Sequence, residues 1–200
     1  MIAKPRKAIR NEYLKRTQNV AVLGGGSWAT ALVKIMTENK RKVHWYMRNE
    51  QAKNRLEKVG RNPNYLSSVV LQKRRLFIST DINEIVKKAD VIVLAIPTAF
   101  LDLELKKITS NLADKIIVSA VKGVIPETLQ IVGPYLNEHF SVPIENIAVI
   151  AGPSHAEEVA MDKLSYLTIA CTDTKKAEFI ATLLKTSYVR TAVSNDIIGT

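Results

Sequence analysis

The sequence of 200 residues contains one cysteine and no long hydrophobic run. No apolar stretch approaches the roughly 20 residues that a membrane-spanning helix needs, so we expect no membrane span. The longest stretches, such as residues 91–96, have the length of buried strands. The lone Cys171 cannot form a disulfide within the chain, which favours a reducing compartment and a cytoplasmic location. Because Cys171 ends the apolar run of residues 167–171, we expect a small buried hydrophobic side chain rather than a catalytic thiol.

Internal repeats, low-complexity segments and Gly/Ser-rich linkers are also absent, so we expect a single folded domain. Hydrophobic residues make up 46% of the chain and charged residues 24%, an ordinary globular composition with enough apolar side chains for a core. The sequence predicts no metal site.

Basic residues outnumber acidic ones and give a formal net charge of +10. Residues 1–18, which we interpret as a basic N-terminal extension, hold six lysines and arginines against one glutamate. The extension has neither the apolar core of a secretory signal nor the serines of a transit peptide, and a surface tail is the simplest interpretation. A basic chain can meet nucleic acid, anionic lipid or phosphorylated small molecules. We favour a phosphorylated small molecule and expect no nucleic-acid partner. Nucleic-acid binding through the extension stays open as a minor alternative.

Short β-branched runs alternate with helical patterns between residues 19 and 194, which predicts an α/β fold of the Rossmann type. We expect a doubly wound, mainly parallel sheet with helices on both faces. The predicted strands are residues 19–23, 42–47, 76–79, 91–96, 115–120, 147–150, 166–171 and 188–193. The predicted helices are residues 27–39, 50–59, 82–88, 126–140, 154–161 and 174–185, and Asn195 is predicted to cap a further helix that begins within residues 195–200.

A glycine-rich turn follows the first predicted strand and opens the first helix. It reads Gly24-Gly-Gly26-Ser27-Trp28-Ala29, a permitted form of the G-x-G-x-x-G/A dinucleotide fingerprint in the required strand-turn-helix context. Gly24 permits the tight turn, Gly26 leaves room for a pyrophosphate, and Ala29 lets the helix pack closely on the strand. The N–H groups and the dipole at the helix N-terminus favour phosphate. Trp28 either packs in the core or lies beside the cofactor.

The end of the second strand bears on which dinucleotide is bound. Sites that prefer NAD usually place Asp or Glu there, but this strand ends in Arg48 and Asn49, and Glu50 lies further on. An arginine suits the 2′-phosphate of NADPH through charge-assisted bonds and stacking on the adenine. The sequence therefore favours NADPH, with NADH tolerated.

Three further segments follow predicted parallel strands: residues 93–98 with Pro97, residues 120–123 with Lys122, and residues 151–158. Because the carboxyl ends of parallel strands share one edge of a sheet, we expect these segments to converge on one crevice with the glycine turn.

With these segments the chain resembles bacterial NAD(P)-dependent glycerol-3-phosphate dehydrogenase from about residue 19 to residue 200. The ordered set of matching stretches is more specific than any one of them. These stretches are residues 24–32, 61–66, 95–97, 121–123, 152–159 and 196–199.

The resemblance implies reduction of dihydroxyacetone phosphate to sn-glycerol 3-phosphate with NADPH or NADH, feeding glycerophospholipid synthesis. It implies that Lys122 contacts both substrate and cofactor. The other cofactor-side residues that it implies are Ser27, Trp28, Arg48 and Ala156, with Tyr65 as a weaker candidate. The glycine fingerprint and the strand-end segments add Gly24, Gly26 and Pro97 to the expected cofactor site. The implied substrate-side residues are Gly152 and Ser154. For Glu157 and Glu158 a first-turn dipole role is favoured over acid–base chemistry, and His155 is not assigned a role.

The resemblance also implies that the main catalytic lysine lies beyond Thr200, on the helix that residues 196–199 begin, and that a helical substrate domain follows. We therefore predict no catalytic residue within this chain, binding of NAD(P)H with negligible turnover, and a homodimer for the full-length protein. A non-catalytic NAD(P)-sensing module is the alternative.

Overall fold

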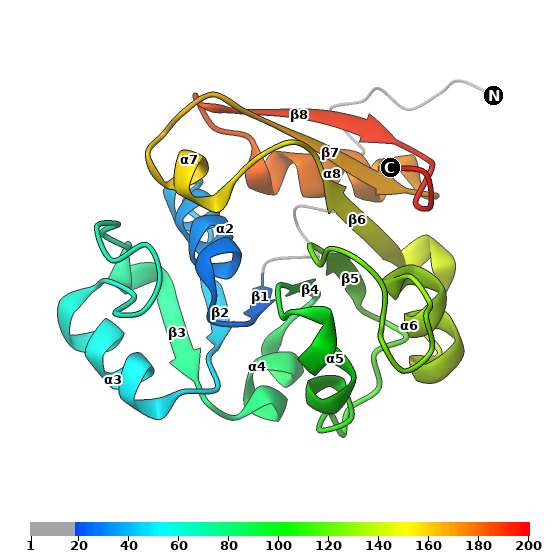
Figure 1. Ribbon diagram of the computed structural model, residues 1–200, viewed down its shortest axis with the longest axis horizontal. Coiled ribbons are helices and arrows are strands. Elements are labelled where there is room, and N and C mark those ends of the chain that lie inside the picture. Colours follow the sequence, from blue (N-terminus) through cyan, green and yellow to red (C-terminus); the bar gives the residue numbers. More distant parts are fainter. Residues whose placement is uncertain (1–18) are drawn as a thin grey trace.

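The computed structural model describes residues 19–200, which form one eight-stranded sheet with helices on both faces (Figure 1). The predicted N-terminal extension, residues 1–18, lies outside the described residues. The strands follow the order β3-β2-β1-β4-β5-β6-β7-β8 across the sheet. They are β1 Val20–Leu23, β2 Val43–Tyr46, β3 Leu76–Ser79, β4 Val91–Leu94, β5 Ile116–Ser119, β6 Ile147–Ala151, β7 Ser165–Cys171 and β8 Val189–Ser194.

The helices divide between the two faces of this sheet, and each face has its own apolar core. On one side pack α2 Ser27–Glu38, α3 Glu50–Val59, α7 Ala156–Ala160 and α8 Thr174–Leu184. On the other side pack α4 Ile82–Lys88, α5 Thr98–Leu105 and α6 Val132–Phe140. Two short 3₁₀ turns, Lys73–Arg75 and Ile144–Asn146, precede β3 and β6. The predicted doubly wound α/β fold is confirmed.

The central strands are hydrophobic at every position because both of their faces are covered. In β1, Val20 and Val22 belong to one core, while Ala21 and Leu23 belong to the other. All four residues of β1, β4 and β5 are buried. Cys171 is also fully buried, as predicted. In the described part of the chain, no helix is long and apolar enough to cross a membrane.

The strands β1 to β6 run parallel, whereas β7 runs antiparallel to β6, and β8 is parallel to β7. The connection between β6 and β7 contains only the five-residue α7, which is too short to carry the chain back along the sheet. The eleven-residue α8 does carry it back, so β8 keeps the direction of β7. The prediction of a mainly parallel sheet therefore holds, with one reversal.

Most predicted elements agree with the structure to within one or two residues, but two helices begin later than predicted and one helix was not predicted. The helix predicted from Pro126 begins only at Val132, because residues 125–131 form a turn closed by a Val124–Ile131 bridge, and Leu129 adopts a left-handed φ of 56°. Helix α5 was not predicted at all, because its apolar residues are spread around the helix instead of forming one stripe. The helix predicted at residues 154–161 is shorter at both ends.

The expected helix after Asn195 is not formed within residues 195–200. Its cap is also assigned to the wrong residue, because the Asp196 carboxylate, not the Asn195 side chain, accepts the N–H groups of Ile198 and Gly199 at 3.0 and 2.8 Å. This is the local geometry that begins a helix. A helix starting here stays a prediction.

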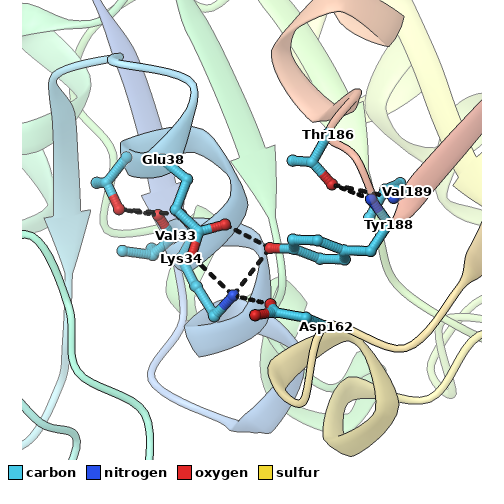
Figure 2. Close-up of polar contacts among 8 residues, drawn as sticks. Val33, Lys34, Glu38, Asp162, Thr186, Tyr188 and Val189 are labelled. Atoms are coloured by element: carbon cyan, nitrogen blue, oxygen red, sulfur yellow. Dashed lines mark hydrogen bonds and ion pairs between the residues drawn. The ribbon is translucent and has the colours of Figure 1, made fainter.

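A buried ammonium group joins the first half of the fold to the last (Figure 2). Lys34 of α2 lies 2.7 Å from the Glu38 carboxylate, 2.5 Å from that of Asp162 and 2.9 Å from the Tyr188 hydroxyl. Burial alone would lower the pKa of Lys34, but the bonds to Asp162 and Glu38 outweigh it and raise that pKa. This cluster, which we call the Lys34 cluster, holds α2 against the segments that precede β7 and β8.

Candidate functional site

The glycine turn between β1 and α2 is tight at its first residue and open at its third. Gly24 donates its N–H to the Tyr46 carbonyl at 3.1 Å and has a φ of 126°. A Cβ on Gly24 would lie 2.3 Å from the Ala95 carbonyl oxygen, so no larger residue fits there. A Cβ on Gly26 would meet nothing within 4 Å. The turn therefore packs against the β4 loop at Gly24 and presents bare backbone at Gly26.

The N-terminus of α2 has no side-chain cap, because its N-cap residue is Gly26. The first N–H groups of an α-helix have no intrahelical partner, so those of residues 27–29 can donate to a ligand. The same end of this twelve-residue helix carries positive partial charge. Ala29 is fully buried where the helix crosses the sheet, which its small side chain permits. The N–H groups at this helix end can therefore donate hydrogen bonds to an anionic group.

The structure adds one residue to the turn that the sequence analysis did not assign. Asn62 is fully buried, and its amide donates to the Gly25 carbonyl at 3.0 Å and to the Thr30 hydroxyl at 2.8 Å. Thr30 in turn donates to the Gly26 carbonyl at 2.9 Å. Asn62 therefore fixes the orientation of the peptide groups on either side of Gly26. Its only sequence signal was its place in the matching stretch of residues 61–66.

Three adjoining cavities follow the carboxyl ends of the parallel strands. The Arg48 pocket, of about 280 Å³, lies between the glycine turn, the end of β2 and α5. The central cleft, of about 510 Å³, lies over the ends of β1, β4 and β5 and the start of α7. The Ile198 pocket, of about 370 Å³, lies between the ends of β5 and β6 and the C-terminal residues. The Arg48 pocket and the central cleft share four lining residues, which are Gly26, Tyr65, Ile96 and Pro97.

The structure brings the predicted site residues together around these cavities. The central cleft is lined by Gly26, Ser27, Trp28, Tyr65, Pro97, Lys122, Ser154 and Ala156. Gly24 and Arg48 line the Arg48 pocket, and Gly152 lines the Ile198 pocket. Trp28 packs partly against the core and also borders the cleft, so its position is compatible with either of the roles considered for it. The roles assigned to these residues stay predictions.

Lys122 stands where two cavities meet, because it lines both the central cleft and the Ile198 pocket. Its side chain is exposed, and it forms no hydrogen bond or ion pair with any other residue from 19 to 200. The ammonium group is therefore available to a ligand that occupies either cavity.

The Gly152 and Ser154 positions have a clear structural role. A Cβ on Gly152, whose φ is 137°, would lie 2.5 Å from the Tyr166 carbonyl oxygen. The buried Ser154 hydroxyl donates to that same oxygen at 2.9 Å. Both residues hold the loop after β6 against β7, which places the start of α7 beside the cleft. The described residues contain no cluster of His, Cys, Asp or Glu side chains that could hold a metal ion.

A buried carboxylate lies in the wall of the Arg48 pocket. Glu104 of α5 accepts a hydrogen bond from the Tyr46 hydroxyl at 2.6 Å and one from the Lys107 ammonium at 2.9 Å. Burial by itself would raise the pKa of this carboxyl, but these two bonds lower it overall. Burial and the bond to Glu104 both raise the pKa of Tyr46. Arg48 approaches Glu104 to 4.0 Å and lies over the Phe100 ring, 5.3 Å from its centroid.

Fold and site together define a Rossmann-type α/β domain with a glycine turn of the dinucleotide-binding kind. The chain belongs to the family described as NAD-dependent glycerol-3-phosphate dehydrogenase N-terminus, whose profile matches residues 19–177. The recognised resemblance is thereby confirmed.

Curated relatives carry the same family name. The chain is 33% identical over 187 residues to a glycerol-3-phosphate dehydrogenase [NAD(P)+] from Limosilactobacillus reuteri, covering 91% of this chain and 55% of that protein. It is 34% identical over 188 residues to one from Latilactobacillus sakei, covering 92% and 55%. The chain therefore spans about half the length of these relatives.

Solved structures confirm the fold. A glycerol-3-phosphate dehydrogenase from Plasmodium falciparum superposes with a TM-score of 0.83 at 20% identity, covering 94% of this chain and 56% of that one. One from Coxiella burnetii superposes with a TM-score of 0.79 at 22% identity, covering 92% and 55%.

Proposed function

We propose that this chain binds NAD(P)H and forms the dinucleotide-binding part of a glycerol-3-phosphate dehydrogenase. The observation that carries this proposal is the open backbone at Gly26, beside an uncapped helix N-terminus and between two cavities. A pyrophosphate that binds there would have one cavity on each side of it. An elongated dinucleotide with two nucleoside ends has the shape that this arrangement fits.

The residues around the cavities fit the cofactor part by part. The N–H groups of Ser27 and Trp28 would hold the pyrophosphate, and the Arg48 pocket would take the adenosine end. The central cleft, with Pro97 and Ala156 in its wall, would take the nicotinamide end. When bound, the nicotinamide supplies the hydride that a ketone reduction requires.

We assign the phosphorylated substrate, dihydroxyacetone phosphate, to the side of Lys122. The ammonium of Lys122 has no partner among residues 19–200 and borders both the central cleft and the Ile198 pocket. A positive charge at this place would stabilise the oxygen of a ketone as negative charge develops on it. Gly152 and Ser154 shape the adjoining loop. The product is sn-glycerol 3-phosphate, which supplies glycerophospholipid synthesis.

We further propose that NADPH is favoured and NADH tolerated. Arg48 supports this preference because its guanidinium borders the pocket next to the glycine turn, where an adenosine 2′-phosphate would lie. We also propose a cytoplasmic location and, for the full-length protein, a homodimer.

Titration of NADPH and NADH into wild type and Arg48→Ala, followed by tryptophan fluorescence, tests the proposal. Trp28 lines the cleft and is the expected reporter. We expect both nucleotides to bind, and we expect Arg48→Ala to weaken NADPH about tenfold while changing NADH little, because a charge-assisted pair is lost only for the phosphate. Equal affinities that the substitution leaves unchanged would contradict the preference. Absence of any binding would contradict the function.

A non-catalytic NAD(P)-sensing module is the second candidate, and Lys122 separates the two. In an enzyme, dihydroxyacetone phosphate should strengthen NADPH binding, because both ligands contact Lys122. The Lys122→Ala variant should lose this coupling. A sensing module has no such coupling in either form of the chain.

A further inference from the structure

Glu104 is an unusual component of a pocket wall because it is a charged side chain with only 2% of its surface exposed. It lines the Arg48 pocket together with the glycine turn and Phe100. A buried carboxylate persists only where nearby donors compensate its desolvation. Tyr46 and Lys107 provide this compensation, and the lowered pKa of Glu104 keeps the group ionised at neutral pH.

The negative charge of Glu104 partly neutralises the positive charge of Arg48. The 4.0 Å separation between the two side chains is too long for a hydrogen bond but close enough for electrostatic attraction. Arg48 itself is 64% exposed at its side chain and rests on the face of Phe100. The guanidinium is therefore held over the pocket mouth by an aromatic ring and a buried carboxylate.

We propose that Glu104 is a specificity-determining residue of the Arg48 pocket, where its carboxylate limits the selectivity for a 2′-phosphorylated nucleotide. This inference rests on the proposed function. Glu104 offsets part of the positive potential that Arg48 provides, and it opposes a phosphate entering the same pocket. A nucleotide with a free 2′-hydroxyl has no such charge and is less affected. With Arg48 attracting the 2′-phosphate and Glu104 repelling it, the pocket would bind both NADPH and NADH.

The test compares the affinities for NADPH and NADH in Glu104→Gln and Asp102→Asn, using the full chain. Both substitutions remove one negative charge from α5. Both original carboxylates accept a hydrogen bond from a tyrosine hydroxyl and pair with a lysine, since Asp102 accepts from Tyr135 and Lys106. Asp102, however, does not line the Arg48 pocket. It is therefore the matched control for a general loss of charge or packing.

We expect Glu104→Gln to shift the ratio of the two Kd values about tenfold toward NADPH, and Asp102→Asn to leave that ratio unchanged. An unchanged ratio in Glu104→Gln, or an equal shift in both variants, overturns the inference while the proposed function stands. If wild type binds neither nucleotide, both the inference and the proposed function are overturned.

A second variant keeps the inference testable if Glu104→Gln does not fold. In Arg48→Ala the carboxylate of Glu104 remains in the pocket without the opposing guanidinium. Because Arg48 is exposed, its replacement leaves the core intact. We expect this variant to bind NADH more tightly than NADPH, since the remaining charge repels the phosphate. Equal affinities of Arg48→Ala for NADH and NADPH would show that Glu104 does not affect binding of the 2′-phosphate, and would overturn the inference.

Discussion

The glycines of the turn after β1 differ in their backbone conformation and in the space around them. Gly24 is fixed by a left-handed backbone and by the Ala95 carbonyl beside it, whereas Gly26 faces open space. The spacing of the fingerprint predicted this division, because a tight turn and a close ligand approach both exclude a side chain. What the spacing could not show is which group of the protein abuts Gly24.

Asn62 was assigned no role from the sequence because the turn that it stabilises lies more than thirty residues away along the chain. A buried amide that bridges two loops has no local pattern. Glu104 escaped prediction for a related reason, because α5 itself has no clear apolar stripe and its buried face was not recognised. Pairings of this kind depend on tertiary packing alone.

We expect Asn62→Ala to weaken NADPH binding at least tenfold and to lower the free energy of unfolding by about 1–3 kcal/mol. The loss follows because the partly buried Gly25 carbonyl loses its donor and the turn loosens. NADPH titration and urea denaturation measure the two effects. The control is Asn39→Ala, which removes an amide bonded to the Leu183 carbonyl at the other end of α2. The assignment fails if both variants lose equal stability and neither loses affinity.

Helices that begin after a clear capping residue were predicted almost to the residue. Helices α3 and α4 begin after Asn49 and Asp81, whose side chains accept the N–H groups of Ala52 and Asn83. The helix start predicted at Pro126 is wrong, because proline suits a β-turn as well as the first turn of a helix. The left-handed Leu129 interrupts the chain before α6 starts. The reversal at β7 was not predictable from its composition, because strand direction depends on the length of the connection.

The side-chain contacts of the Lys34 cluster, which join α2 to Tyr188 before β8, should make the stability of the fold depend on pH. Burial and the bond to Glu38 raise the pKa of Tyr188 to about 12, against about 10 in an unfolded chain. A raised folded-state pKa means that the stabilisation is complete below about pH 10 and is lost as the pH rises toward 12. Lys34, whose pKa is also raised, acts in the same direction.

We therefore expect the free energy of unfolding to fall above pH 10, and to fall less steeply in Tyr188→Phe. At pH 8 the variant should be less stable by about 1 kcal/mol, because the bonds to Lys34 and Glu38 are lost. Urea denaturation at several pH values measures both effects. Replacement of the exposed Tyr166 by Phe is the control. A parallel pH dependence in wild type and Tyr188→Phe would rule out this role for the cluster.

At the scale of the whole molecule, the order of strands and helices predicted both the layered fold and the meeting of distant segments at one edge. Lys122, Pro97 and Ala156 come from three different strand ends, and all three line the central cleft. The convergence was predictable because parallel strands place their carboxyl ends together. The subdivision into three cavities was not, since it depends on the side chains that separate them.

The bare backbone at Gly26 is where the pyrophosphate of the proposed cofactor would bind. A ligand held there contacts loops from several strands, so its binding should stabilise the entire domain, by about 2.7 kcal/mol at a concentration one hundred times Kd. No neighbouring atom opposes a methyl group at Gly26, so Gly26→Ala should fold normally.

The most direct test is NADPH titration of wild type and Gly26→Ala, with unfolding followed in parallel. We predict saturable binding to wild type, an affinity at least tenfold weaker for Gly26→Ala, and unfolding free energies within about 1 kcal/mol of each other without ligand. Equal NADPH affinity in the two proteins would contradict the account, because a side chain would then occupy the place assigned to the pyrophosphate without effect.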